Sequence, residues 1–356
     1  MVYLDYAATM PLLESAKLSM HEAEEWLFAN ASALHTPGHL AMNEIEACRN
    51  LLAEIINAKP EEIIFTSGSS EANNTVIRTF EGCEIETSPL EHHSILETAK
   101  VYAGDNQPKL YSYMLANNET GEFLELPKKQ PGEYLHSDLT QALGKVQIDV
   151  KALDLDYATF SAHKIGGPVG VGALYVKEGV PFKPLIIGGN QEKKRRGGTY
   201  NTVGIAGFKA ALQNIKERKT WEIYDTKVRQ LRDTLAEKIL QGVPGSSLNT
   251  DLDKEKSLPN ILNVSFEAAE GESIQLYLDA EKIIVSTGSA CASGDIKPSH
   301  VLMAKTGDAE VAHSSIRFSF GPENTMDDVE EVMRVLPGII KRLQSISTVK
   351  RKDDKA

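Results

Sequence analysis

Cysteine is scarce in this sequence. Its 356 residues include three cysteines, an odd number with wide spacing and no C-x-x-C pair. A disulfide framework is therefore not indicated. Cys48 lies on an apolar helical pattern and Cys83 begins a short β-like run, so both are expected to pack. Cys291 lies in a loop of small polar residues, Ser286 to Asp295, where a thiol is reachable.

Long apolar runs and an excess of positive charge are missing as well. No run approaches the roughly 20 residues of a membrane-spanning helix, and the opening Met-Val-Tyr-Leu-Asp-Tyr lacks a basic and an apolar signal region. The 38 Lys and Arg against 50 Asp and Glu give a net charge of −12, which argues against binding nucleic acid or an anionic membrane. We expect a cytoplasmic protein.

The length and the pattern of elements predict two domains. Strands that alternate with helices predict an α/β domain with a mainly parallel central sheet flanked by helices. After Gly242–Gly245 the pattern changes to that of a smaller α+β domain. The predicted boundaries are 12–245 for the large domain, 1–11 with 246–348 for the small domain, and 349–356 for a disordered charged tail.

The individual elements follow from apolar periodicity and turn residues. Predicted strands cover 63–66, 84–88, 110–116, 134–138, 157–161, 172–176 and 184–188, then 260–266, 283–286 and 315–320 in the small domain, which closes with a helix over 326–346.

Polar side chains gather where the predicted parallel strands end. They are Thr66, His92, Asn118, Asp138 and Lys164. Because open parallel sheets bind ligands at the carboxyl ends of their strands, this clustering predicts a ligand site at that edge.

A second signal follows the strand over 63–66. Ser67-Gly68-Ser69-Ser70 leads into an apolar helical pattern, so backbone N–H groups, the helix dipole and the hydroxyls of Ser69 and Ser70 converge as in a phosphate site. An ordinary serine N-cap is the alternative. No Gly-Lys-Ser/Thr follows, so a Walker loop and a nucleotide triphosphate are disfavoured.

Two basic positions also have alternatives. The run 157–170 contains Ser161, His163 and Lys164 before a glycine-rich turn. Burial there would lower the pKa of the lysine amine and free it for a Schiff base, although an isolated lysine is usually exposed. The basic run 193–196 before Thr199 is either a solvated loop or a phosphate or carboxylate contact.

A lysine amine, a phosphate cradle, an aspartate and a histidine together suggest pyridoxal phosphate. Lys164 would form the imine, Asp138 would keep the pyridine nitrogen protonated, and His92 would stack on the ring and shuttle protons.

Several short motifs occur in the order found in one known family. They are 3–9 (Tyr-Leu-Asp-Tyr-Ala-Ala-Thr), 66–71 (Thr-Ser-Gly-Ser-Ser-Glu), 91–92 (Glu-His), 117–119 (Asn-Asn-Glu), 138–141 (Asp-Leu-Thr-Gln), 161–164 (Ser-Ala-His-Lys), 197–199 (Gly-Gly-Thr), 286–291 (Ser-Thr-Gly-Ser-Ala-Cys) and 313–319 (His-Ser-Ser-Ile-Arg-Phe-Ser). On these motifs the chain resembles the cysteine desulfurases, fold-type I pyridoxal phosphate enzymes of the class V aminotransferase group, over nearly its whole length.

The resemblance implies a role for each matching residue. Lys164, Asp138 and His92 keep the roles given above, and Arg317 with help from Asn30 would bind the substrate carboxylate. A strand-edge salt bridge is the alternative for Arg317. The remaining cofactor ligands would be Ser69, Ser70, Ser161 and His163 on the phosphate, Thr199 from the second subunit of a homodimer, Gln141 on the phenolic oxygen, and Asn118 close to it.

The implied reaction converts L-cysteine to L-alanine. Lys164 would remove the α-proton, and the thiolate of Cys291 would attack the substrate sulfur and keep it as a persulfide. The insertion after Cys291 resembles the branch of the family in which a mobile loop carries sulfur to an iron–sulfur scaffold protein. No resident metal is expected, only a transient iron–sulfur contact at Cys291.

The chain also departs from the family pattern. It is shorter between His92 and Asn118, where we expect an edge strand and a helix to be missing, and the interval from Asn118 to Asp138 is shortened as well. The loop Asn30-Ala31-Ser32-Ala33 replaces the usual Asn-Pro-Ser-Ser. Alternative functions are a selenocysteine lyase, another class V lyase or an aminotransferase, and a non-catalytic interaction protein. Cys291 argues against the aminotransferase, and Lys164 argues against the non-catalytic protein.

Overall fold

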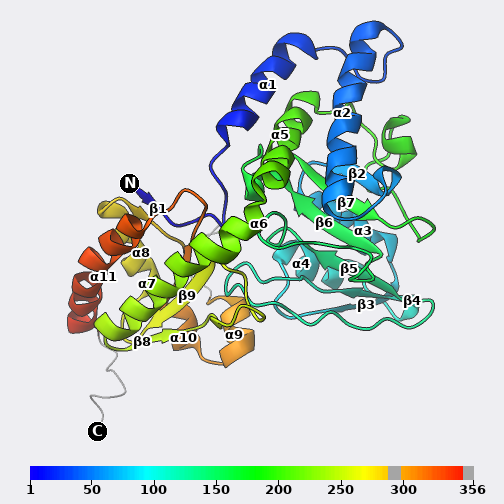
Figure 1. Cartoon of the computed structure of the whole chain (residues 1–356). Helices are drawn as coiled ribbons and strands as arrows, with labels where there is room; N and C mark the ends of the chain where they lie inside the picture. The colour runs from blue at the N-terminus through cyan, green and yellow to red at the C-terminus, as the bar shows by residue number, and fades with distance from the viewer. Residues whose placement is uncertain (288–297, 348–356) are drawn as a thin grey trace. The chain divides into compact units, whose positions relative to one another are not determined.

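The computed structural model describes residues 1–287 and 298–347 (Figure 1). They form two compact units. The sheet unit consists of Thr9–Leu115 and Leu124–Trp221, and the terminal unit consists of Met1–Ala8, Ala116–Phe123 and the described part of 222–356. The chain therefore leaves the sheet unit after Leu115, contributes one short segment to the terminal unit and returns.

The sheet unit is built on six strands in the order β2-β7-β6-β5-β4-β3. They are β2 (Ile63–Thr66), β3 (Cys83–Thr87), β4 (Asn106–Ser112), β5 (Tyr134–Asp138), β6 (Tyr157–Ser161) and β7 (Gly172–Val176). Strand β7 is antiparallel to both its neighbours, whereas β6, β5, β4 and β3 are mutually parallel. All strands except β7 thus run in one direction, and their carboxyl ends share one edge.

Side chains alternate between the two faces of this sheet. On β2, Ile63 and Phe65 join the core beneath α2 (Thr36–Ile55) and α5 (Thr202–Arg218). Ile64 points the other way, into the core beneath α3 (Ser69–Thr79) and α4 (His93–Tyr102). Helix α1 (Glu14–Trp26) packs on α5. Helices therefore cover both faces of the sheet (Figure 1).

The connections between the parallel strands differ. Strand β3 reaches β4 through helix α4. The described residues 113–133, between β4 and β5, contain no helix, and neither do residues 139–156 between β5 and β6. Parallel neighbours are ordinarily joined by a crossover that contains a helix. The region that the sequence marked as shortened overlaps the first of these helix-free connections.

The terminal unit combines small sheets with helices. Strands β8 (Ser246–Leu248), β9 (Ile261–Phe266) and β11 (Ser315–Ser319) form an antiparallel sheet in the order β11-β9-β8, and β1 (Val2–Tyr3) pairs in parallel with β10 (Ile283–Ile284). Its helices are α7 (Arg229–Gly242), α8 (Gly271–Ala280), α9 (His300–Thr306), α10 (Ala309–His313) and α11 (Met326–Ile346). Helix α7 continues a helical stretch that starts as α6 (Thr220–Ile223) and passes through a π-turn over Tyr224–Val228. Apolar side chains of α7, α8 and α11 share one core with β9 and β11.

The predicted fold class is confirmed, since a mainly parallel sheet between helices is joined by a smaller α+β unit. The closing helix covers the predicted residues Met326–Ile346. The strand predicted over 184–188 is wrong. Ile187 is 88% exposed, and this segment joins the loop that follows it through one backbone bond, from Gly197 N–H to the carbonyl of Ile186 (2.8 Å).

Two further predictions concern membrane spans and the residues that the structure does not describe. Within 1–287 and 298–347, no helix is long and apolar enough to cross a membrane. Cys291 and the tail 349–356 lie outside the described residues.

Candidate functional site

Lys164 lies just beyond the carboxyl end of β6. The residues after the strand form the 3₁₀ turn η2 (Ala162–Ile165), which ends at Gly166 in a left-handed conformation (φ 81°). The segment before α1 crosses this turn, and Met10 N–H donates to the carbonyl of His163 (3.0 Å). Lys164 is half-buried at the edge where the parallel strands end.

The start of α3 lies at the same edge. Its capping residue is Gly68 (φ 155°, ψ −179°), a conformation that side chains rarely adopt, so the serine N-cap considered from the sequence is wrong. A Cβ at Gly172 would lie 2.7 Å from Cα of Gly68, and Gly172 pairs with Ser161 across β6 and β7. Ser161, Ser69 and Ser70 are thus gathered around one helix N-terminus. A Cβ at Gly68 would meet no atom of the described residues within 4 Å, so these residues leave room beside Gly68.

Asp138, the last residue of β5, is held by two donors. Its Oδ1 accepts from Thr140 N–H and its Oδ2 from the side-chain amide of Asn73, both at 2.9 Å. His136 lies two residues earlier on the same face of β5, where its ring nitrogens contact two strand hydroxyls (2.8 and 3.0 Å). Burial lowers the pKa of His136 to about 4, so this ring is neutral near pH 7.

His92 is the capping residue of α4. Its Nδ1 accepts from Ser94 N–H (3.1 Å), so a neutral ring carries its proton on Nε2. Desolvation lowers the pKa of His92, Asp138 partly opposes this shift, and the charge of Lys164 adds to it. His92 is therefore a neutral Nε2–H donor near pH 7, in the electrostatic field of Asp138 and Lys164.

The other predicted residues of the sheet unit have different surroundings. Gln141 is buried in the turn after β5. His163 lies beside Thr9 (Nδ1 to Oγ1, 3.2 Å), and desolvation with the nearby lysine charges lowers its pKa to about 4. Asn30 is exposed, and its side-chain oxygen accepts from Ser32 N–H (2.9 Å).

The basic run 193–196 is mostly engaged with its own unit. Arg196 forms an ion pair with Glu71 in the first turn of α3 (2.9 Å), and Arg195 donates to the carbonyl of Glu61 (2.7 Å). The two lysines of the run are exposed. Thr199 is exposed at a cavity of about 170 Å³ that Ser67 and Arg196 also line. The run therefore shapes a loop next to α3.

Arg317 is the functional candidate on β11 of the terminal unit. One Nη donates to the carbonyl of Asn118 and the other to Asp5 Oδ1, each at 2.8 Å. The side chain is buried, and its Nε has no hydrogen-bond partner among the described residues. The salt bridge considered from the sequence exists, and it leaves one buried donor for a further acceptor.

Asn118 is not where its predicted strand would put it. Strand β4 ends at Ser112, and Asn118 belongs to the segment Ala116–Phe123 of the terminal unit. In that segment Asn117 Oδ1 accepts from the N–H groups of Glu119 and Thr120 (2.8 and 3.0 Å), which turns the carbonyl of Asn118 toward Arg317. The strand predicted over 110–116 therefore ended too late, since β4 stops at Ser112.

Glu119 is a buried carboxyl whose function the sequence did not predict. It accepts from the hydroxyl of Ser299 (2.5 Å), the residue that caps α9. Burial raises the pKa of Glu119 to about 7, although Ser299 and the charge of Arg317 counteract the shift.

The described residues on both sides of Cys291 are held in place. Ser286 and Arg317 exchange two backbone hydrogen bonds (3.2 and 2.7 Å). Ser299 is held by Glu119. The residue before the Cys291 segment, Ser286, is thus bonded to Arg317, and the residue after it, Ser299, is bonded to Glu119, whose pKa responds to Arg317.

Lys145 is the second buried group that the sequence did not predict. It is 2% exposed, and its Nζ donates to the carbonyl of Gln141 (3.0 Å). Burial, and next the charge of Lys164, lower its pKa to about 7. Asn73, which donates to Asp138, was likewise unforeseen. Only a tertiary contact distinguishes these side chains from surface ones, so no local pattern could have identified them.

Comparison with known proteins gives one consistent result. The model of the family "Aminotransferase class-V" matches the chain in two pieces, residues 2–110 and 103–332. The cysteine desulfurase IscS of Dictyoglomus turgidum is 38% identical over 386 aligned positions, which cover 98% of this chain and 97% of the relative.

Solved structures agree with this relationship. A NifS-like protein superposes with a TM-score of 0.83 at 32% identity and covers 97% of this chain and 98% of its own. A structure of SspA in complex with cysteine has a TM-score of 0.73 at 28% identity and covers 91% and 100%. The chain therefore belongs to the class V aminotransferase family, in the group of pyridoxal phosphate-dependent enzymes that contains the cysteine desulfurases.

Proposed function

We propose that this enzyme is a cysteine desulfurase that converts L-cysteine to L-alanine and holds the sulfur as a persulfide on Cys291. The observation that carries the proposal is the strand-end edge of the sheet unit. There the charges of Asp138 and Lys164 both act on His92, and the glycine-capped start of α3 is at the same edge. Full-length similarity to cysteine desulfurases supports the same activity.

The residues present fit pyridoxal phosphate. The room that the described residues leave beside Gly68 suits a phosphate on the N-terminus of α3, with Ser69, Ser70 and Ser161 around it. Asp138 is kept as an acceptor by its two donors and suits a protonated ring nitrogen. Gln141, Asn118, His163 and Thr199 are proposed as the further ligands, with Thr199 acting from the second subunit of a dimer.

When bound, the cofactor supplies an aldehyde for a covalent link to an amine and a ring that accepts electrons. The chain supplies the acid and base groups. Lys164 Nζ takes the proton from the α-carbon of the substrate and returns it during product formation. His92 is neutral with its proton on Nε2, so it would be placed to stack on the bound ring and to supply that proton.

Arg317 is the proposed ligand of the substrate carboxylate, with Asn30 assisting. Its two Nη groups are fixed by Asn118 and Asp5, which orient the guanidinium, and the buried Nε remains to donate. A charge-assisted bond from an oriented guanidinium is strong and selective for a carboxylate. The single salt bridge to Asp5 leaves this role intact.

Cys291 is the proposed sulfur acceptor. Its thiolate forms an S–S bond with the substrate sulfur while the Cβ–S bond of cysteine breaks, and a proton added at the β-carbon completes alanine. The hydrogen bonds that hold Ser286 and Ser299 support this role, because these residues flank the Cys291 segment and connect it to Arg317 and its neighbours.

The proposed partners are a second copy of the chain and an iron–sulfur scaffold protein in the cytoplasm. Several large apolar side chains of the sheet unit are exposed, which favours coverage by another protein surface: Trp26, Phe28, Leu34, Val169 and Ile187. Replacing Leu34 and Ile187 by Glu should lower the mass measured by light scattering from dimer to monomer. An unchanged mass would contradict the dimer contact.

Incubation of the purified enzyme with L-cysteine tests the activity. We expect alanine in solution and a mass increase of one sulfur on the peptide that contains Cys291. A Cys291→Ser variant should bind the cofactor normally and lose the persulfide. Full alanine production from cysteine by that variant would contradict the mechanism and favour a different class V lyase.

A further inference from the structure

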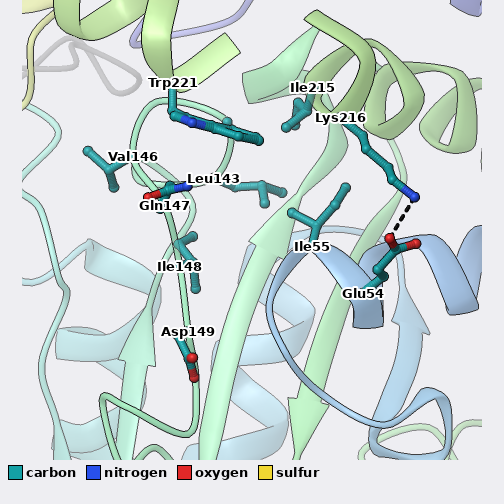
Figure 2. Close-up of a pocket in the computed structure, with 11 residues that line it drawn as sticks. Glu54, Ile55, Leu143, Val146, Gln147, Ile148, Asp149, Ile215, Lys216 and Trp221 are labelled. Carbon is teal, nitrogen blue, oxygen red and sulfur yellow. Dashed lines mark ion pairs between the residues drawn. The ribbon is translucent and has the colours of Figure 1, made fainter. Parts of the chain in front are cut away.

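The segment Ala116–Phe123 of the terminal unit contains a buried carboxyl to which the proposed mechanism gives no role. Glu119 is 5% exposed, and its Oε2 accepts from the hydroxyl of Ser299 (2.5 Å). Glu54 of α2 is a surface carboxylate by contrast, since it forms an ion pair with Lys216 of α5 (2.6 Å) at the rim of a cavity of about 490 Å³ (Figure 2). Taking a carboxyl out of water is costly, so the burial of Glu119 calls for a reason.

The main chain of Glu119 is held without help from its side chain. Its N–H donates to Asn117 Oδ1 (2.8 Å), and its carbonyl accepts from the side-chain amide of Asn263 on β9 (3.2 Å). These bonds fix the turn that presents the carbonyl of Asn118 to Arg317. The orientation of Arg317 therefore does not depend on the carboxyl of Glu119.

The carboxyl of Glu119 instead fixes the start of α9. Ser299 caps this helix, because its Oγ accepts from Leu302 N–H (3.1 Å) while its hydroxyl donates to Glu119. Val301 and Leu302 are fully buried, so the first turn of α9 is packed inside the terminal unit. Ser299 lies just after the Cys291 segment. The bond to Glu119 therefore anchors the chain where it leaves that segment.

A second acidic residue of the same segment contacts the other end of α9. Glu122 forms an ion pair with Lys305, and their side chains are 37% and 26% exposed. Exposed ion pairs contribute little to stability, whereas the buried bond between Glu119 and Ser299 is shielded from water. Glu122 is therefore the matched reference for Glu119, with the same charge, the same segment and the same helix.

We propose that Glu119 is a positioning residue for sulfur transfer, which acts through the hydroxyl of Ser299 on the anchor of the Cys291 segment. The segment that carries Glu119 also presents the carbonyl of Asn118 to Arg317. One short stretch of chain thus supports both the substrate ligand and the anchor of the sulfur acceptor. Two reacting sulfur atoms must meet within a narrow range of distances, so a small displacement of either lowers the rate strongly. The inference rests on the proposed function for the step at Cys291.

Variants on both sides of the bond test the inference. Glu119→Leu keeps the approximate size of the side chain and removes the acceptor, and Ser299→Ala removes the donor. Each should slow persulfide formation on Cys291 about tenfold or more, measured by mass spectrometry in a single turnover of the holoenzyme with L-cysteine. Glu119→Gln keeps an acceptor for the hydroxyl and should stay within about threefold of the wild type. Because the two groups share one interaction, the double variant of Glu119→Leu with Ser299→Ala should lose no more than either single variant.

Substrate binding separates positioning from general damage. L-Alanine has the amine and the carboxylate of the substrate but no sulfur, and its effect on the visible absorption of the holoenzyme gives a dissociation constant. That constant should change by less than about threefold in Glu119→Leu and in Ser299→Ala, because Arg317 keeps its bonds to Asn118 and Asp5. The controls Glu122→Gln and Glu54→Gln should leave both the persulfide rate and the dissociation constant near the wild-type values.

Hydrogen exchange of α9 gives a measurement that needs no turnover. The amides of this helix should exchange faster in Glu119→Leu and in Ser299→Ala than in the wild type, and not in Glu122→Gln. Persulfide rates within about twofold of the wild type in both Glu119→Leu and Ser299→Ala would overturn the inference, as would a loss in Glu119→Gln equal to that in Glu119→Leu. If the wild type forms no persulfide while the exchange of α9 changes as expected, the proposed function fails and the hold of Glu119 on α9 stands.

Discussion

Each unit contains a buried titratable side chain that interacts electrostatically with a residue proposed to act on cofactor or substrate. In the sheet unit it is Lys145, which interacts with Lys164, and in the terminal unit it is Glu119, which interacts with Arg317. Burial lowers the pKa of the lysine and raises that of the glutamate, and both arrive at about 7. Desolvation acts against charge of either sign, so a base and an acid converge on the same value.

The two groups differ in their neighbours. Glu119 receives the hydroxyl of Ser299 and the attraction of Arg317, and both counteract its shift. Lys145 has a backbone carbonyl and a like charge, and Lys164 enlarges its shift. The neighbours of Glu119 therefore stabilise its carboxylate and partly offset the effect of burial. For Lys145, burial and the neighbouring charge both disfavour the ammonium form.

The largest effect on stability is expected from Lys145→Met. The pKa of Lys145 is about 7 in the folded chain and near 10.5 when unfolded. The buried charge therefore lowers the stability of the wild type fully below pH 7, and this destabilisation disappears as the pH rises toward 10.5. The variant should be more stable at about pH 6, by at most about 5 kcal/mol, and the gain should shrink by about pH 9. Urea unfolding at both pH values measures this, and a gain that does not depend on pH would break the comparison.

Glu119→Gln should show a smaller effect with the opposite pH dependence. The pKa of Glu119 is raised from 4.5 to about 7, so the stability that it contributes is complete below pH 4.5 and is lost as the pH rises through 7. As the pH rises from 4.5 to 7, the free energy of unfolding of the variant minus that of the wild type should therefore increase, by at most about 3 kcal/mol. Urea unfolding from about pH 5 to about pH 8 tests the sign. A constant difference would show that the carboxyl does not titrate in this range.

Ser299→Ala tests whether the partners of Glu119 cause the difference between the two groups. Loss of the hydroxyl donor should cost about 1–3 kcal/mol above pH 7 and raise the pH at which stability declines. The same unfolding series measures both quantities. The nearby Ser286→Ala, which leaves the backbone bonds to Arg317 in place, is the matched control. Equal behaviour of the two variants would remove Ser299 from the network.

The smallest effect is expected from Asp5→Asn. Asparagine still accepts from the Nη of Arg317 but loses the opposite charge, so the guanidinium stays oriented and is less neutralised. We expect the KM for cysteine to change by less than about threefold, against a rise of roughly tenfold or more in Arg317→Gln. Steady-state alanine formation measures both. Equal KM values in the two variants would exclude a carboxylate contact at Arg317.

Local sequence patterns predicted the site residues that lie at the end of a strand or at the start of a helix. Lys164 and Asp138 follow or end apolar strands, and Ser69 and Ser70 start a helix, so a periodic pattern places each of them. The strand over 184–188 failed because an apolar run does not show whether a neighbouring strand exists. The end predicted for the strand over 110–116 was wrong because β4 stops at Ser112 and the chain leaves the sheet unit after Leu115, which no local signal announces.

The buried titratable groups could not be predicted in the same way. Lys145 follows a glycine in a turn, where a lysine is usually solvated. Its burial depends on Ile215 and Thr220, more than 60 residues later in the chain, which close over Gly144. Glu119 depends likewise on Ser299, 180 residues away. Contacts of this separation are set by the whole fold.

The pairing of β1 with β10 has a consequence for the order of assembly during synthesis. Val2 is among the first residues made, yet its strand partner is Ile283. At about 5–20 residues per second, the first strand waits roughly a quarter of a minute to a minute for that partner to be translated. The sheet unit is complete once Trp221 has been made, whereas the terminal unit needs the start, the middle and the end of the chain. The sheet unit should therefore fold first on the ribosome, and the N-terminal residues should remain unpaired until nearly the whole protein has been synthesised.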